Sequence, residues 1–224
     1  MIVVKFGGHA MSDSHGDFAQ AIADAISLGV EIVSVQGGGP QIGTALESAG
    51  ITTEFIGGFR VTTPEVFEIV ERVLAMEIGP AVAQSLCSHG IKAVAISGRD
   101  SKTLIAEKLT TLVDGTRADL GLVGTVIEVN PEKIQTLVTQ GSVPVISPVA
   151  TDALGTHGFN VNADIAAAAI AGAVLRATGS NKISAGVTPM SRHCSPTKKR
   201  WSLLATTMGR MASAVMPCKR CSVS

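Results

Sequence analysis

The sequence lacks a stretch long enough to cross a membrane, and it lacks the signals of export. Its longest apolar run, Ile165–Leu175, is mostly alanine and is shorter than the roughly 20 residues that a membrane-spanning helix needs. The N-terminal Met1–Lys5 carries no basic region and no cleavage site typical of a signal peptide. We therefore expect a cytoplasmic protein with no membrane partner, in which disulfide bonds do not form.

Charged residues are scarce, and acidic residues are missing from one end of the chain. Charged residues make up 16% of the 224 residues and apolar residues 46%, which excludes a disordered composition and allows a buried core. Residues 1–175 carry 9 Lys and Arg with 18 Asp and Glu, whereas residues 176–224 carry 9 Lys and Arg and no acid. Three of the four cysteines also lie in the second part. The change of composition predicts two regions, 1–174 and 175–224.

Short apolar runs alternate with helical patterns through the first region. The apolar runs predict buried strands at Met1–Phe6, Glu31–Gln36, Lys92–Ser97 and Val143–Ile146. Helical spacing predicts helices around Phe18–Leu28, Gln41–Ala49, Pro64–Met76, Ile78–His89, Pro131–Val138 and from Ala163 onward. The short alternation between Thr103 and Glu128 predicts hairpins. Strands separated by helices favour an α/β fold with a mostly parallel central sheet between helices.

Two glycine-rich turns follow the first two predicted strands, Gly7-Gly8 and Gly37-Gly38-Gly39. The sequence contains no GxxxxGK(S/T) P-loop and no GxGxxG fingerprint between a strand and a helix. Ligands of open α/β sheets bind at the carboxyl ends of strands, where such turns bring backbone N–H groups close. The geometry of a strand-to-helix turn is by itself another explanation for the glycines.

Lys5 stands one residue before the end of an otherwise apolar strand. Burying an ammonium group without a partner is costly, so the position favours a lysine that reaches into a ligand crevice and meets an anion. The alternative is a side chain that extends along the sheet edge to solvent.

Polar residues precede the alanine-rich helix, and one arginine stands alone. Asn160, Asn162 and Asp164 alternate just before that helix. A helix N-cap by Asn162 or Asp164 is one explanation, but three polar side chains exceed what a cap requires. Arg60 is a single cation in the apolar, glycine-rich stretch Gly57–Thr62. It is either a bidentate partner for a carboxylate or a solvated loop arginine.

Seven short segments lie in a fixed order along residues 1–174. They are Lys5–Gly8 (KFGG), Val35–Pro40 (VQGGGP), Gly58–Thr62 (GFRVT), Ala95–Asp100 (AISGRD), Leu122–Val126 (LVGTV), Pro144–Pro148 (PVISP) and Asn160–Asp164 (NVNAD). In this order they resemble the N-acetylglutamate kinases, which are the amino acid kinase superfamily enzymes of arginine biosynthesis. Each segment alone is unspecific, but seven in register are not.

The resemblance implies an amino acid kinase-like three-layer sandwich, with residues 1–174 as its N-terminal, substrate-binding part. It also implies an activity, the ATP-dependent phosphorylation of the γ-carboxylate of N-acetyl-L-glutamate. Mg²⁺ is expected to arrive on the nucleotide, with few or no protein ligands. The helix Pro64–Met76 corresponds to one that helps to form a dimer in the family, so a homodimer is expected.

The same resemblance implies roles for individual residues. Lys5 is expected to stabilise the charge of the transition state, and Asp164 to orient the catalytic lysines. The remaining roles are phosphate binding by Gly7 and Gly8, and substrate binding by Gly38, Gly39, Arg60 and Asn160.

The resemblance ends after Val174. The family continues into a nucleotide-binding half with a second lysine, and nothing around Lys182, Lys198 or Lys199 matches it. The Ser, Thr, Arg and Cys-rich residues 175–224 are interpreted as an atypical basic tail, read in a shifted frame or naturally disordered. A zinc site would need His193, Cys194, Cys218 and Cys221, and a nucleic-acid contact would need the basic cluster Lys198–Arg200 beside Trp201. A short basic cluster is usually solvated, so we expect no nucleic-acid partner.

Three functional hypotheses follow. The first is an acetylglutamate kinase. The second is a catalytically dead fragment that at most binds acetylglutamate or dimerises. The third is a related amino acid kinase that acts on an acetylaminoadipate-like substrate.

Overall fold

The computed structural model describes residues 1–7, 16–178 and 184–187, all of which belong to one compact unit, Met1–Arg192. That unit extends past residue 174, where the composition changes. None of the helices within these described residues combines the length and the hydrophobicity that a membrane span requires.

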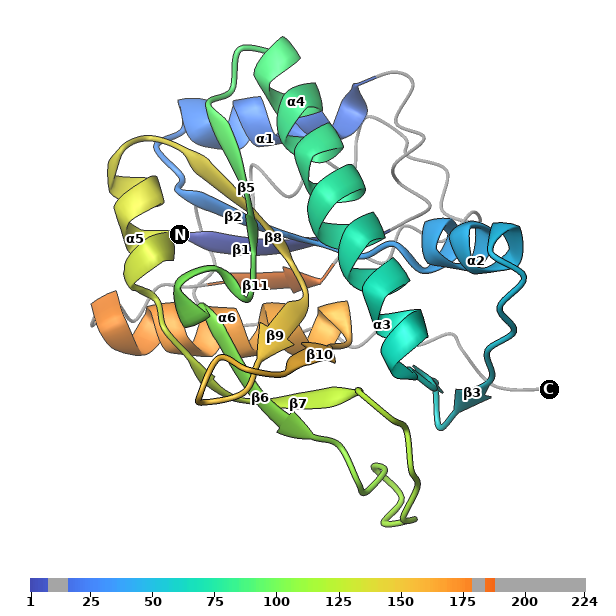
Figure 1. Cartoon of the computed structure of the whole chain (residues 1–224). Coiled ribbons are helices and arrows are strands. Elements are labelled where there is room, and N and C mark those ends of the chain that lie inside the picture. Colours follow the sequence, from blue (N-terminus) through green and yellow to red (C-terminus); the bar gives the residue numbers. More distant parts are fainter. Residues whose placement is uncertain (8–15, 179–183, 188–224) are drawn as a thin grey trace, which may run out of the picture. The chain divides into compact units, whose positions relative to one another are not determined.

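A five-stranded parallel sheet forms the centre of the unit, in the order β11-β1-β2-β8-β5 (Figure 1). Its strands are β1 (Ile2–Phe6), β2 (Ile32–Gln36), β5 (Ala93–Ser97), β8 (Val143–Ser147) and β11 (Ser184–Val187). The first four are the strands that the apolar runs predict. Every residue of β2 and β8 is buried, as expected for parallel strands covered on both faces. The fifth strand, β11, follows the predicted boundary at residue 174 and pairs with β1.

Helices cover both faces of this sheet and make three layers. Successive residues of a strand point to opposite faces, so β1 sends Ile2 and Phe6 into one core and Val3 into the other. The first core is closed by α1 (Asp17–Ser27), α2 (Gly39–Ser48) and the long helix described below. The second core is closed by α5 (Glu132–Thr139) and α6 (Ala163–Thr178). The predicted α/β fold, with a mostly parallel sheet between helices, is confirmed.

One long helix crosses the first face where the sequence predicts two. It consists of α3 (Pro64–Glu71), the π-helical segment η2 (Arg72–Ile78) and α4 (Gly79–Ser88). Pro80 has no N–H to donate to the carbonyl of Met76, and in a regular α-helix its ring would clash with that carbonyl. The wider π turns accommodate the proline, so the helix continues through it. The predicted break between Pro64–Met76 and Ile78–His89 is therefore wrong.

A second, mixed sheet has the order β10-β9-β6-β7. Its strands are β6 (Leu104–Lys108), β7 (Gly124–Val129), β9 (Val149–Thr151) and β10 (Gly158–Asn160). The short helix η3 (Asp100–Lys102) precedes β6 in the chain. The antiparallel β6–β7 pair confirms the hairpin predicted between Thr103 and Glu128. The strands β9 and β10, and the two-residue strands β3 (Phe55–Ile56) and β4 (Phe59–Arg60), are too short to give a periodic pattern and were not predicted.

Candidate active site

Lys5 lies near the carboxyl end of β1, on the face of the sheet that α6 covers. Its Nζ atom is 3.3 Å from Oδ1 of Asp164, and the two side chains are 17% and 50% exposed. The lysine also lies beside two glycines: a Cβ atom would stand 3.8 Å from its Nζ at Gly7 and 3.8 Å from its Cε at Gly37. The mostly buried ammonium group therefore has an acidic partner and two stretches of glycine backbone around it.

The start of α6 presents the carboxylate of Asp164 to this lysine. The Oδ1 atom of Asn162 accepts hydrogen bonds from the backbone N–H of Asp164 at 2.8 Å and of Ile165 at 3.3 Å. Asn162 is thus the N-cap, which settles the choice that the sequence left between it and Asp164. Because Asn162 caps the helix, the carboxylate of Asp164 is available to Lys5. A helix N-terminus also favours a negative charge in its first turn.

The second glycine turn leads into α2, which begins at Gly39 rather than at the predicted Gln41. Pro40 occupies the first turn of this helix, where its missing N–H is not needed. At Gly38 a Cβ atom would lie 2.5 Å from Cδ1 of Ile78 and 2.8 Å from Cδ2 of Leu74, so the long helix packs closely on this residue. At Gly39 such a Cβ would have no heavy atom of the described residues within 4 Å, apart from its chain neighbours and the backbone of its own helix. The turn is close-packed on one side and open on the other.

Arg60, on β4, reaches the same turn. Its Nη1 donates to Thr53 Oγ1 at 2.9 Å, its Nη2 donates to the carbonyl of Gly39 at 3.3 Å, and its Cζ stands 4.6 Å from the ring centre of Phe55. Burial lowers the pKa of Arg60 from its usual value. No ion pair found among the described residues includes Arg60. Arg60 is therefore not a freely solvated loop arginine. Neutral groups hold its guanidinium in place, and the N–H groups of the guanidinium can still donate to a carboxylate.

Asn160, at the end of β10, is tied to Arg60 through Thr62. The buried Thr62 hydroxyl donates to the carbonyl of Arg60 at 2.8 Å and accepts from Nδ2 of Asn160 at 3.1 Å. The backbone then runs from Asn160 through Asn162 to Asp164. The structure thus brings Lys5, Gly7, Gly38, Gly39, Arg60, Asn160 and Asp164 to the same region, at the carboxyl edge of the parallel sheet.

Several residues named from the sequence lie outside the described residues. They are Gly8, the three tail lysines Lys182, Lys198 and Lys199, and the suggested zinc ligands His193, Cys194, Cys218 and Cys221. Within the residues that the structure describes, no group of three or more His, Cys, Asp and Glu side chains could hold a metal ion.

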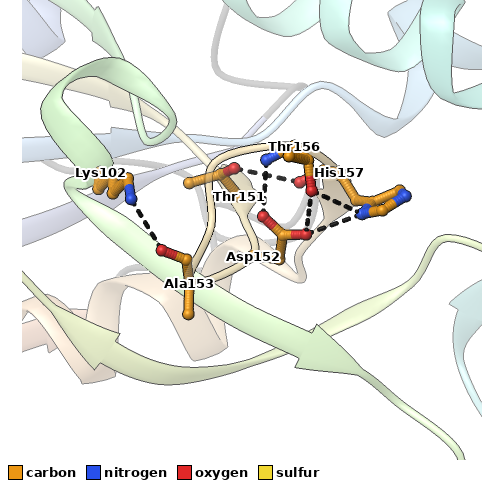
Figure 2. Close-up of polar contacts among 6 residues, drawn as sticks. All are labelled: Lys102, Thr151, Asp152, Ala153, Thr156 and His157. Atoms are coloured by element: carbon orange, nitrogen blue, oxygen red, sulfur yellow. Dashed lines mark hydrogen bonds and ion pairs between the residues drawn. The ribbon is translucent and has the colours of Figure 1, made fainter.

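A second polar cluster closes the turn between β9 and β10 (Figure 2). The Asp152 carboxylate accepts hydrogen bonds from Nδ1 of His157 at 2.8 Å and from the hydroxyl and backbone N–H of Thr156, each at 2.7 Å. These bonds, chiefly that from His157, hold the pKa of Asp152 well below its usual range. Nearby, the Lys102 ammonium donates to the carbonyl of Ala153 at 2.8 Å. The cluster shapes the hairpin that carries Asn160.

Sequence reasoning missed the buried polar residues Gln36, Thr62 and Ser147, which connect the site to its surroundings. Gln36 and Ser147 could have been found from the sequence, because each is a polar residue at the end of an apolar strand. Gln36 ends β2 directly before the glycine turn, and Ser147 ends β8.

The fold and this edge define an α/β protein in which Lys5, Arg60 and a glycine-rich turn lie at the carboxyl ends of parallel strands. The chain belongs to the amino acid kinase family, whose model matches residues 1–177.

Relatives are found among curated proteins and among solved structures. An acetylglutamate kinase from Rhodococcus jostii is 46% identical over 176 residues, which is 78% of this chain and 57% of that protein. One from Nocardia farcinica is 46% identical over 173 residues, which is 76% of this chain and 57% of that protein. This chain therefore spans somewhat more than half the length of these relatives. A solved structure from Streptococcus mutans shows the same fold, with a TM-score of 0.70 at 23% identity. The match covers 92% of this chain and 83% of the Streptococcus mutans chain.

Proposed function

We propose that this chain acts in arginine biosynthesis as an acetylglutamate kinase, transferring the γ-phosphoryl group of ATP to the γ-carboxylate of N-acetyl-L-glutamate. The observation that carries the proposal is the 46% identity, over 176 residues, to a protein named acetylglutamate kinase. The arrangement of Lys5, Asp164 and Arg60 supports it, because the reaction needs cations beside two carboxylates and a phosphoryl group. A cytoplasmic location, expected from the sequence, and a homodimer, expected from the family resemblance, belong to the same proposal.

The chemistry asks little of the protein beyond position and charge. A carboxylate is ionised at neutral pH, so no general base is needed. A γ-carboxylate oxygen attacks the γ-phosphorus, the new O–P bond forms, and the bond to the β-phosphate oxygen breaks as ADP leaves. Catalysis of such a step consists of alignment and of neutralising charge on the transferred group.

Lys5 supplies the charge that this step needs. Its ammonium group lies at the end of β1 between glycine backbones and is only 17% exposed, so its charge is weakly screened. Asp164, 3.3 Å away, holds the ammonium in place. Both roles are those implied by the resemblance.

Arg60 and the glycine turn would hold the substrate. The guanidinium of Arg60 would bind the α-carboxylate, and Asn160 would hydrogen-bond the substrate. Gly38 and Gly39 would cradle it at the N-terminus of α2, where the N-cap residue Gly38 has no side chain with which to cap the first N–H groups. Such groups favour a negatively charged ligand.

The described residues fit the phosphates of ATP. Lys5 and the backbone at Gly7 would contact them, and by the resemblance Gly8 as well. Mg²⁺ bound to the nucleotide would neutralise part of the phosphate charge. Residues 1–174 would then be the substrate-binding part. The basic residues 175–224 would begin inside the same unit, because α6 ends at Thr178 and β11 (Ser184–Val187) pairs with β1.

A second candidate function is that of a catalytically dead fragment that at most binds N-acetyl-L-glutamate or dimerises. It is considered because nothing around Lys182, Lys198 or Lys199 matches the second lysine of the family. A third candidate is a kinase for an acetylaminoadipate-like substrate, for which the same site would have to accept a longer side chain.

Two measurements on the full 224-residue chain separate these candidates. Hydroxylamine converts an acyl phosphate into a hydroxamate, which gives a coloured complex with ferric ion, so ATP-dependent hydroxamate formation measures the reaction. Calorimetric titration with N-acetyl-L-glutamate measures binding. Product and binding support the kinase, binding alone supports the fragment, and the absence of both contradicts the proposal. Tighter binding of N-acetyl-L-aminoadipate would favour the third candidate.

A further inference from the structure

A buried polar cluster lies behind the glycine turn, on the opposite face of the sheet from Lys5. Gln36 and Ser147 end the neighbouring strands β2 and β8 and are 0% and 1% exposed. The Nε2 atom of Gln36 donates to Ser147 Oγ at 2.7 Å and to the carbonyl of Leu74 at 2.6 Å, and the Ser147 hydroxyl donates to the same carbonyl at 2.9 Å. Two side chains from the sheet therefore hold one backbone oxygen of the long helix.

That oxygen belongs to the π-helical segment. The backbone N–H of Gly79 also donates to the Leu74 carbonyl, so three donors meet at one acceptor. Gly79 leaves room for them: a Cβ atom there would lie 3.1 Å from both Gln36 Nε2 and Ser147 Oγ. The wide turn that Pro80 imposes is thus fixed to the sheet at a single point.

The same leucine touches the glycine turn. The side chains of Leu74 and Ile78 fill the space in which Gly38 would carry a Cβ atom. The next carbonyl, that of Gly39, accepts the hydrogen bond from Arg60. A shift of Leu74 would therefore move Gly38 and Gly39, and with them the anchor of the guanidinium.

We propose that Gln36 and Ser147 are positioning residues: by holding the Leu74 carbonyl they press the long helix against Gly38 and so set the turn and the arginine that receive the carboxylate ligand. The ligand part of this inference rests on the proposed function, in which that ligand is N-acetyl-L-glutamate. Buried hydrogen bonds of this kind are demanding, since removing one partner leaves the other unsatisfied. Oε1 of Gln36 has no hydrogen-bond partner among the described residues, so the side-chain hydrogen bonds described for Gln36 are those that its Nε2 atom donates.

The chain offers a matched control on the same strand. Ser142 directly precedes β8 at its other end, is 4% exposed, and its hydroxyl has no partner among the described residues. Ser142→Ala therefore removes the same buried hydroxyl far from the glycine turn. Val143→Ala, in the same neighbourhood, removes buried apolar atoms and lowers stability without touching the cluster.

The test compares Gln36→Leu, Ser147→Ala and Gly79→Ala with both controls in the full chain. Gly79→Ala keeps every polar group and displaces the cluster only by crowding it. Calorimetry measures binding of N-acetyl-L-glutamate, and amide hydrogen exchange measures opening of the segment from Gly37 to Ile42. We expect the three test variants to weaken binding about five- to tenfold and to speed exchange in that segment by a similar factor. If the chain turns over, KM rises by that factor while kcat stays within about twofold.

The controls decide the result. Ser142→Ala should match the wild type in binding and exchange. The inference is overturned if Val143→Ala weakens binding as much as Ser147→Ala does, because the effect would then follow general stability. It is also overturned if exchange between Gly37 and Ile42 stays at the wild-type rate in all three test variants. Failure of the wild-type chain to bind the ligand would contradict the proposed function, and the exchange comparison would still decide the positioning role.

Discussion

Lys5 and Asp164 are joined by an ion pair of 3.3 Å that connects the carboxyl end of β1 to the first turn of α6. The two residues are far apart in sequence and come from opposite ends of the family match. Their meeting places a partly buried positive charge where the parallel strands end. A lysine held in this way is oriented before any ligand arrives.

The first prediction concerns this lysine. Lys5→Met removes the charge and keeps most of the side-chain volume, so hydroxamate formation should fall about 100- to 1000-fold. Binding of N-acetyl-L-glutamate should change less than about threefold, because the role proposed for Lys5 is to stabilise charge on the transferred phosphoryl group. Asp164→Asn should reduce the rate less, because the lysine remains and only its orientation is loosened.

Lys92 provides the control. It lies exposed before β5 and donates to the carbonyl of Gln140 at 3.2 Å. Lys92→Met should leave the rate unchanged. A Lys5→Met variant that retained the wild-type rate would remove Lys5 from the mechanism.

The second prediction concerns Arg60. Arg60→Lys keeps the charge, but a flexible ammonium group cannot donate two parallel hydrogen bonds to one carboxylate as a guanidinium does. Binding of N-acetyl-L-glutamate should weaken about tenfold in calorimetry.

N-acetyl-L-isoglutamine, in which an amide replaces the α-carboxylate, tests which carboxylate Arg60 holds. The wild type should bind this ligand more weakly than N-acetyl-L-glutamate, by a factor similar to that caused by Arg60→Lys. The Arg60→Lys variant should bind it only slightly more weakly than the wild type does. If Arg60→Lys weakens the binding of both ligands by the same factor, Arg60 does not contact the α-carboxylate.

Much of the fold could be predicted from the sequence, because strands such as β2 and β8 are buried on both faces and read as short apolar runs. The continuity of the long helix could not, since Pro80 normally predicts a break and only tertiary packing makes the π turns acceptable. Strands of two or three residues carry no period, so the second sheet was only half predicted.

The residues of the site could be named from short segments, but their connections could not. Asn160 and Thr62 are 98 positions apart, and no local pattern links them. The anchoring of Arg60 by the carbonyl of Gly39 depends on where α2 begins, which the sequence placed two residues too late. Gln36 stands out at the end of its strand, but its contacts with Ser147 and the carbonyl of Leu74 are visible only when the strands and the long helix are assembled.

The third prediction concerns backbone strain at Ser101. This residue has φ 53°, in the left-handed region that glycine adopts without strain. Ser101→Gly should therefore raise the free energy of unfolding by about 0.5–1 kcal/mol, the relief of strain exceeding the added freedom of the unfolded chain.

Ser85, exposed in the middle of α4, is the matched control for this substitution. Ser85→Gly should lower the free energy of unfolding by about 0.5 kcal/mol, because glycine is the poorer helix former. Urea denaturation measures both variants. Equal effects of the two substitutions would contradict a strained Ser101.

The fourth prediction concerns pH and the turn between β9 and β10. Hydrogen bonds from His157 and Thr156 lower the pKa of Asp152 in the folded chain, whereas in the unfolded chain this carboxyl titrates near pH 4. A lowered folded-state pKa stabilises the fold above the unfolded value, and this stabilisation disappears as the pH falls through the folded value. Asp152→Asn should therefore be less stable than the wild type at about pH 5, and the difference should shrink toward about pH 2.

Urea denaturation at a series of pH values between these limits measures that difference. Thr156→Val removes the hydroxyl donor but keeps the backbone N–H bond and the contact with His157, so its effect should have the same sign and be smaller. Because this turn carries the strand that ends in Asn160, Asp152→Asn should also weaken binding of N-acetyl-L-glutamate at neutral pH. Parallel stability curves for wild type and Asp152→Asn across the acidic range would show that the carboxylate contributes nothing to folding.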